Sequence, residues 1–266
     1  MKKIFLWTMA ALCVSGLALT GCTMEDNPYP QLQTVEKELL NIDFETGQAS
    51  DYWTKGVGYL VTPEAEGSTG QAASIKQGSD RADYILLPAE VTNKLTNSVA
   101  YNVDFDIMIN NGAKTAFLTV TSQDCWLDNG SVAWNNWGYF WDTTTTANGQ
   151  HHNPYLLALT LPGNEATAYV NEHYNGETGF VNNGDSWSFT YSSWYHVTLN
   201  VDVAAHSVAY KFTNKADDKD VTTGKYAVPE GESTIIKGIY ERNNRYNYDP
   251  GAIVIDNIKV VGLFKE

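Results

Sequence analysis

Apolar and polar residues alternate with a period of two along most of the chain after residue 39. In the clearest run, 101–109, Tyr, Val, Phe or Ile occupies every second position, with Asn, Asp or Met between them. Residues 195–203 repeat this pattern. Because successive side chains of a β-strand point to opposite faces, this spacing predicts strands with one buried face.

Further short runs of the same kind predict strands at 40–45, 84–87, 115–121, 155–161, 167–170, 207–213, 234–240 and 252–261. Clusters of Gly and Asn separate them, such as Gly-Ser-Thr-Gly at 67–70 and Asn-Asn-Gly at 110–112. Only 33–39 is compatible with a short helix. Many short strands joined by such turns predict an all-β fold, an antiparallel β-sandwich, in one domain over 37–266.

The N-terminus differs from the rest in that an apolar run, 4–14, follows Lys2 and Lys3. This predicts a secretory signal peptide at 1–21. The signal ends in Leu19-Thr20-Gly21-Cys22, which resembles a bacterial lipobox and implies a lipid on Cys22. Residues 22–36 would form the lipidated tether. The alternative is an ordinary signal peptide that contains a Cys.

Lipidation implies attachment to a membrane, since two or more acyl chains hold a protein there stably. Glu25-Asp26 resembles the surface-export signal of lipoproteins in glycan-harvesting bacteria. We therefore expect the chain on the bacterial outer membrane, at the cell surface or, as the alternative, facing the periplasm. Of its three cysteines only Cys125 would remain free, so no internal disulfide is expected.

The net charge of the chain limits the classes of molecule that it can bind. It carries a net charge of -14, or -16 once the two signal lysines are removed from the count. Such an acidic surface repels phosphate backbones and disfavours nucleic acid as a partner. Neutral, hydroxyl-rich ligands and divalent cations remain open.

Three motifs resemble a known fold family. They are Asn41-Ile42-Asp43-Phe44-Glu45-Thr46-Gly47 followed by Trp53, the central run 194–202, and Ile255-Asp256-Asn257-Ile258-Lys259-Val260. They resemble concanavalin A-like and laminin-G-like jelly-roll domains, including carbohydrate-binding modules. The resemblance implies a sandwich of the lectin and glucanase type and a glycan ligand, with glycan-import or glycan-degrading proteins as partners. It also implies a structural Ca²⁺ shared by Glu45 and Asp256, although each could instead be a solvated strand end.

Segment 123–155 carries aromatic and amide side chains in a mixture suited to sugars. An aromatic ring can lie under the apolar face of a sugar, while amides bind its hydroxyls. As a strand, 137–141 would place Trp137, Tyr139 and Trp141 on one face as a platform, with Trp134 beside it and Phe140 in the core. Trp126 is a further candidate. The alternative is that some of these rings fill the sandwich edge, and a register shift of one residue would turn the platform inward.

A second polar cluster, 240–250, adds Arg242, Arg245, Tyr246 and Tyr248 as ligand-binding candidates. Its alternative is a solvated loop whose arginines pair with the acidic surface.

Asp104 and Asp106 share one face of a predicted strand, and paired carboxylates are what glycoside hydrolysis requires. The alternating Glu and Asp signature of the family's glucanases is absent, however, and acids on such a face are usually solvated. We therefore expect carbohydrate binding without catalysis. A polysaccharide hydrolase or lyase of the same fold, and an adhesion or scaffold protein, are the alternatives.

Overall fold

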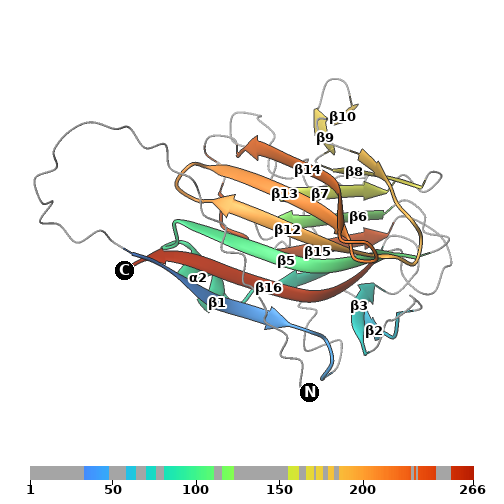
Figure 1. Ribbon diagram of the computed structural model, residues 1–266, viewed down its shortest axis with the longest axis horizontal. Coiled ribbons are helices and arrows are strands. Elements are labelled where there is room, and N and C mark those ends of the chain that lie inside the picture. Colours follow the sequence, from blue (N-terminus) through green and yellow to red (C-terminus); the bar gives the residue numbers. More distant parts are fainter. Residues whose placement is uncertain are drawn as a thin grey trace, which may run out of the picture. The chain divides into compact units, whose positions relative to one another are not determined.

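The computed structural model describes residues 33–47, 58–63, 70–75, 81–110, 116–122, 155–161, 166–170, 172–175, 179–182, 186–228, 231, 233–243 and 253–266 (Figure 1). They lie in one compact unit, Gln33–Glu266. None of the described helices is long and apolar enough to cross a membrane.

An eight-stranded antiparallel sheet forms one layer (Figure 1). Its strands, in spatial order, are β14 (Lys219–Ala227), β13 (Ser207–Asn214), β12 (Trp194–Asp202), β5 (Ala100–Ile109), β16 (Ile253–Lys265), β3 (Ala72–Ile75) and β2 (Gly58–Val61), with β1 (Thr34–Ile42) also paired to β16. Strand β1 runs antiparallel to β16, so Thr34 pairs with Lys265 at the end of the sheet.

A six-stranded antiparallel sheet forms the second layer. Its order is β11 (Ser186–Ser188), β8 (Thr167–Val170), β7 (Tyr155–Leu161), β6 (Ala116–Thr121), β15 (Gly238–Asn243) and β4 (Arg81–Leu86). A separate hairpin joins β9 (Glu172–Asn175) to β10 (Gly179–Asn182), and one short helix, α2, spans Ala89–Leu95.

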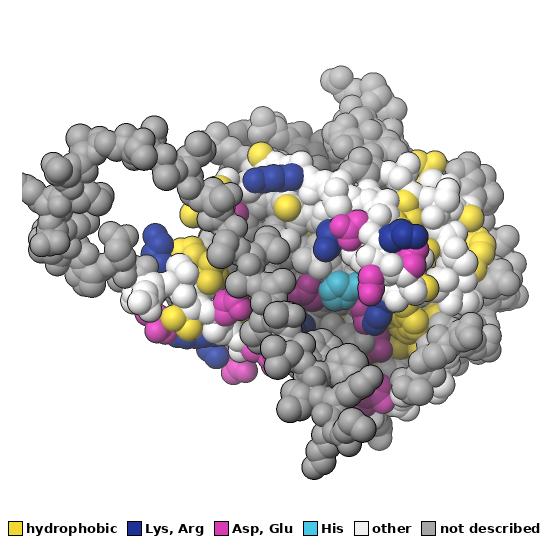
Figure 2. All heavy atoms as spheres, in the orientation of Figure 1, with side chains coloured by type: hydrophobic (Ala, Val, Ile, Leu, Met, Phe, Trp, Pro, Cys, Tyr) yellow, Lys and Arg dark blue, Asp and Glu magenta, His cyan; other side chains and the backbone are white. Residues whose placement is uncertain are grey.

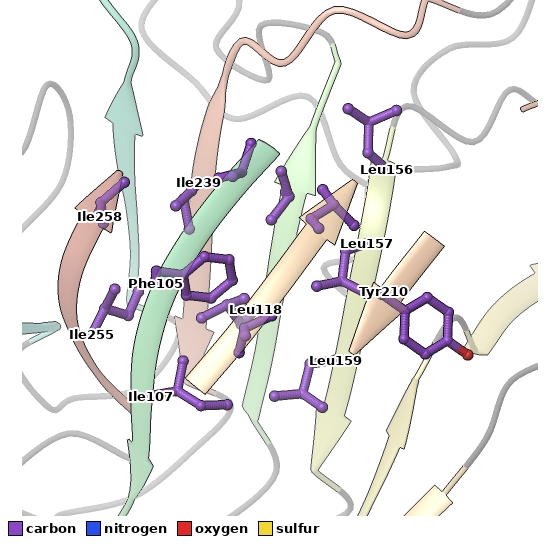
Figure 3. Close-up of a cluster of buried hydrophobic side chains, with 14 of the residues drawn as sticks. Phe105, Ile107, Leu118, Leu156, Leu157, Leu159, Tyr210, Ile239, Ile255 and Ile258 are labelled. Atoms are coloured by element: carbon purple, nitrogen blue, oxygen red, sulfur yellow. The ribbon is translucent and has the colours of Figure 1, made fainter. Parts of the chain in front are cut away.

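The apolar faces of the two sheets meet in one core. Figure 3 shows Phe105 and Ile107 of β5 directed toward Leu118 of β6 and Leu159 of β7. Side chains of β12 alternate between buried and partly exposed, as the sequence pattern predicts. Each large apolar side chain that is fully buried in this way contributes about 1.5–3 kcal/mol, so the alternation largely determines which face of each strand lies inside.

The predicted antiparallel β-sandwich is confirmed by this architecture. The strands expected at 155–161 and 167–170 have the same bounds in the structure. The short helix that the pattern allowed at 33–39 is wrong, because Thr34–Ile42 is strand β1, whose pairing with β16 supplies its backbone hydrogen bonds. Strand β1 also starts at Thr34, within the segment predicted as tether.

Candidate functional site

A group of charged and amide side chains lies on the outer face of the eight-stranded sheet, which we call the charged cluster. It consists of Asp104, Asp106, His196, Lys215 and Asn257. Figure 2 shows acidic and basic side chains gathered around a histidine on this face. The register places these side chains together, because β5 pairs His196 with Asp106 on one side and Asp106 with Asp256 on the other.

Asp106 is the centre of the charged cluster and the least exposed member of its ion pairs. Its side chain is only 4% exposed, whereas that of His196 is 40% exposed. Oδ1 of Asp106 is 2.8 Å from Nδ1 of His196. Oδ2 accepts hydrogen bonds from Lys215 Nζ at 2.5 Å and from Asn257 Nδ2 at 2.9 Å. Every oxygen of this buried carboxylate therefore has a partner, as a buried charge requires.

These contacts set the protonation of the charged cluster. Burial opposes the negative charge of Asp106, but hydrogen bonds from His196, Lys215 and Asn257 outweigh it and lower the pKa of Asp106. Interactions with Asp104 and then Asp106 raise the pKa of His196 to about 9. At neutral pH the imidazole is therefore a cation between two carboxylates.

Asn257 reaches Asp106 because strand β16 contains one extra residue there. Pairing with β5 shifts between Asp256 and Lys259, which face Asp106 and Asp104. Asn257 lies in this bulge with φ 53°, a left-handed conformation that Asn tolerates better than most residues. The bulge directs its side-chain amide toward the Asp106 carboxylate.

The two predicted calcium ligands, Glu45 and Asp256, interact electrostatically beside the charged cluster. Burial, followed by the negative charges of Asp106 and Glu45, raises the pKa of Asp256 to about 6. Oε1 of Glu45 accepts a hydrogen bond from the Gln71 amide at 3.1 Å. A Cβ on Gly70 would lie 2.0 Å from that oxygen, so Glu45 occupies the space that only glycine leaves open.

The sequence pattern led us to expect Asp104 and Asp106 of β5 to be solvated. Asp106 is instead buried and ion-paired. Sequence reasoning also missed His196, Lys215 and Asn257. The alternation placed His196 on the polar face of its strand, but nothing in the sequence gave its cross-strand partner. Among the described residues, no three His, Cys, Asp or Glu side chains are grouped as a metal would need.

A row of three residues crosses the outer face of the six-stranded sheet. Tyr240 of β15, Thr119 of β6 and Ala158 of β7 pair in register. They alternate with core residues such as Leu118 and Ile239, yet all three are buried. Within the described part of the chain, the Thr119 hydroxyl has no hydrogen-bond partner. We call these residues the outer row.

Most predicted ligand-binding residues lie outside the described residues: Trp126, Trp134, Trp137, Tyr139, Trp141, Arg245, Tyr246 and Tyr248, and with them the lipidation candidate Cys22. Arg242 lies in β15, paired with Ala82 and Phe117. The segment 123–154 connects the end of β6 to the start of β7, whereas 244–252 follows the opposite end of the neighbouring β15. The two predicted binding segments therefore join the sheet at opposite ends.

Comparison with solved structures identifies the fold. A protein of unknown function from Shewanella oneidensis MR-1 is 10% identical, with a TM-score of 0.52, over 92% of this chain and 97% of that one. The two chains share an antiparallel β-sandwich fold.

Lectin II from Ulex europaeus is 10% identical, with a TM-score of 0.48, over 86% of this chain and 100% of that one. The CBM2 module of the evolved Dit of Lactobacillus casei BL23 phage J-1 is 9% identical, with a TM-score of 0.47, over 88% and 99%. No protein-family model matches the chain, and no curated protein matches it significantly.

Proposed function

We propose that this chain is a lipid-anchored protein of the bacterial cell surface that binds carbohydrate through the outer face of its six-stranded sheet, without cleaving it. The proposal rests on the point at which the aromatic segment 123–154 joins the six-stranded sheet. It connects β6 to β7, two central strands that bear Thr119 and Ala158 of the outer row. The rings predicted to stack on sugars therefore belong to the connection nearest, along the chain, to a buried hydroxyl that has no hydrogen-bond partner among the described residues.

The chemistry of the outer row suits a ligand rich in hydroxyl groups. A buried hydroxyl without a partner is uncommon and costs about 1–3 kcal/mol. Because Thr119 is buried, a sugar hydroxyl would reach its Oγ1 only where the side chains that bury it are displaced. It could then donate to or accept from that oxygen and remove the cost. The tryptophans of 123–154 would add stacking against the apolar face of the ring.

Replacing Thr119 with Val tests this assignment, because it keeps the shape of the side chain and removes the hydroxyl. We expect the free energy of unfolding to stay equal or rise, since the Thr119 hydroxyl makes no hydrogen bond to the described part of the chain. Glycan affinity, measured by calorimetry against a polysaccharide panel, should fall about 3- to 10-fold, as expected for one net hydrogen bond. Trp137→Ala and Trp141→Ala should weaken binding further and reduce the change in tryptophan fluorescence on titration.

Thr198→Val is the matched control, because Thr198 is a partly exposed threonine on the other sheet. It should leave glycan affinity unchanged. The proposal is wrong if no glycan of the panel binds, or if Trp137→Ala and Trp141→Ala only unfold the protein. New reducing ends or unsaturated uronates in the same mixtures would contradict binding without cleavage. Capture of proteins in the absence of any glycan binding would favour an adhesion or scaffold role.

The proposal includes a structural Ca²⁺ held by Glu45 and Asp256. Carboxylate oxygens are the ligands that Ca²⁺ prefers. The raised pKa of Asp256 reflects burial and negative charges from Asp106 and Glu45 that a divalent cation would balance. The remaining ligands would be carbonyl oxygens and water.

Calcium should raise the Tm of the wild-type chain, because an ion bound only by the folded state stabilises it. Glu45→Gln and Asp256→Asn should abolish that increase. In chelator, Asp256→Asn should leave the Tm equal or higher, since it removes a charge that burial disfavours. Glu36→Gln, at an exposed position of β1, is the control and should keep the calcium response. An equal response in all four proteins would refute the site.

A further inference from the structure

The outer face of the six-stranded sheet has no Asp or Glu at the strand positions that the structure describes, although the chain contains 31 such residues. Core residues such as Leu118 and Ile239 define the inner face, so every second residue of these strands belongs to the outer one. The two acids of these strands, Asp83 and Glu241, pair with each other and share the inner face with Ile239. Among the described outer positions, Arg242 is the one charged residue.

The outer face of the eight-stranded sheet has the opposite character. Asp104 and Asp106 of β5 lie on it, and Asp256 of β16 pairs with Asp106. These carboxylates would repel a negatively charged ligand, whereas the described outer positions of the six-stranded sheet hold none that would do so. The acidity of the chain is therefore distributed unevenly between the two faces.

Arg242 occupies a position next to the outer row. It follows Tyr240 by two residues on β15 and so belongs to the same face, where it pairs with Ala82 on one side and Phe117 on the other. Thr119 is its diagonal neighbour, at about 7–8 Å, which a long side chain can span. None of these described neighbouring positions holds a carboxylate that would pair with a guanidinium.

We infer, on the basis of the proposed function, that the carbohydrate bound at this face is acidic and that Arg242 pairs with the carboxylate of a uronate unit. A guanidinium presents a planar fork of N–H donors that matches the two oxygens of a carboxylate. A uronate carries its carboxylate and its hydroxyls on one ring. Its carboxylate would pair with Arg242 while one of its hydroxyls reaches Thr119 of the outer row.

The net charge of the whole chain does not prevent this pairing. A chain with a net charge of -14 repels an anionic ligand at long range. At about 0.1 M ionic strength, however, the repulsion between solvent-exposed charges is largely screened beyond about 10 Å. A carboxylate in contact with Arg242 is well within that distance and is attracted. Affinity should therefore depend on Arg242 more than on the total charge.

Calorimetric titration with uronate oligosaccharides tests the inference from the side of the ligand. The probes are oligosaccharides of pectin, alginate and hyaluronan, each compared with a reduced preparation in which every carboxylate has become a neutral hydroxymethyl group. We expect at least one acidic probe to bind the wild-type chain, and its reduced form to bind about 10- to 100-fold more weakly, as expected for lost hydrogen bonds to a charged group. This comparison needs no variant, so it does not depend on how a substitution affects folding.

Arg242→Gln tests the inference from the side of the protein. It should weaken binding of the acidic probe about 10- to 100-fold and leave binding of the reduced probe unchanged. Lys225→Gln is the matched control, because Lys225 is exposed on β14 of the other sheet and its loss changes the net charge equally. It should bind both probes as the wild type does. Thermal unfolding verifies that both variants are folded.

The outcomes separate this inference from the proposed function. Equal affinity of the wild-type chain for acidic and reduced probes, or binding of neutral glycans alone, would overturn the inference and leave carbohydrate binding intact. An Arg242→Gln variant that still prefers the acidic probe would overturn the assignment of Arg242. If no glycan binds, acidic or neutral, both proposals fail.

Discussion

Asp106 shows how a single buried charge can organise a protein surface. It accepts hydrogen bonds from residues of two strands and one turn, namely His196, Asn257 and Lys215. Removing one partner of a buried ion pair costs more than the pair contributes, because the remaining charge loses its compensation. The outer face of the eight-stranded sheet is therefore constrained by electrostatics as well as by packing.

The protonation of His196 predicts how stability depends on pH. Its folded pKa of about 9 lies above the ordinary value of 6.5, so the folded state binds the proton more tightly. The stabilisation is fully present below pH 6.5 and is lost as pH rises through 9. In chelator, we expect the urea midpoint of the wild-type chain to fall across this window, and that of His196→Gln to fall less.

Asp256, with a pKa of about 6, is mostly ionised across this window and contributes to the slope mainly at its lower end. His206→Gln serves as the control and should show the wild-type slope. Parallel slopes for His196→Gln and wild type would mean that the imidazole gains nothing from its carboxylates. Because the ring is 40% exposed, solvent screening makes the effect smaller than the pKa change alone implies.

At the scale of elements, the bulge in β16 makes the charged cluster possible. A regular strand would alternate its side chains strictly, and Asn257 would not follow Asp256 toward the same carboxylate. The extra residue requires a left-handed conformation at Asn257, with φ 53°. Conformation and hydrogen bonding are thus two separate contributions of this residue.

Two substitutions separate these contributions. Asn257→Gly keeps the conformation and loses the hydrogen bond to a charged group, which costs about 1.5–3 kcal/mol. Asn257→Ala loses the same bond and adds left-handed strain of about 1–2 kcal/mol. We expect urea unfolding to rank the proteins as wild type, then Gly, then Ala.

Asn200→Ala, at an exposed position of β12, is the control and should stay within about 0.5 kcal/mol of wild type. An Ala variant at position 257 that is as stable as the Gly variant would show that the bulge carries no strain.

Elements with strict alternation could be predicted from sequence, and others could not. Strand β12 was predicted to within a residue because each of its inward positions is apolar. Strand β1 was open to a helical interpretation, since Glu36, Lys37 and Glu38 have no clear period and only pairing with β16 makes them a strand. Helix α2 was missed because it has only seven residues.

The candidate sites were harder to predict, because they depend on contacts between distant residues. Asp106 and His196 are 90 positions apart, and Asn257 is 151 positions from Asp106. The alternation of apolar and polar residues predicts which face of a strand a side chain occupies. The register between strands, which the sequence does not give, determines which residue of the neighbouring strand lies beside it. Only the resemblance suggested that Glu45 and Asp256 would be neighbours, and their electrostatic interaction agrees with that pairing.

At the scale of the whole molecule, the sandwich has two outer faces with different chemistry. One carries the charged cluster, and the other carries the buried outer row, two of whose residues lie on the strands β6 and β7 that the predicted aromatic segment connects. Glycan binding on the second face, as proposed, would leave the first face available to other ligands.

The proposed anchor can be tested on the whole protein. In cells, Cys22→Ser should move the chain from the detergent-extracted membrane fraction to the soluble fraction, because it removes the thiol that would carry the lipid. Cys125→Ser is the control and should remain with the membrane. If Cys22→Ser stays in the membrane fraction, lipidation at Cys22 is not what holds the chain there.

The antiparallel pairing of β1 with β16 also determines how the molecule would respond to force. Thr34 pairs with Lys265, and the Glu266 amide donates to the Gln33 carbonyl at 2.8 Å, so the two ends of the folded unit leave it side by side (Figure 1). A pull that separates these ends would load the hydrogen bonds of the pair one after another, beginning at Gln33. Strand β1 would unzip at low force, while the core between the two sheets remained folded.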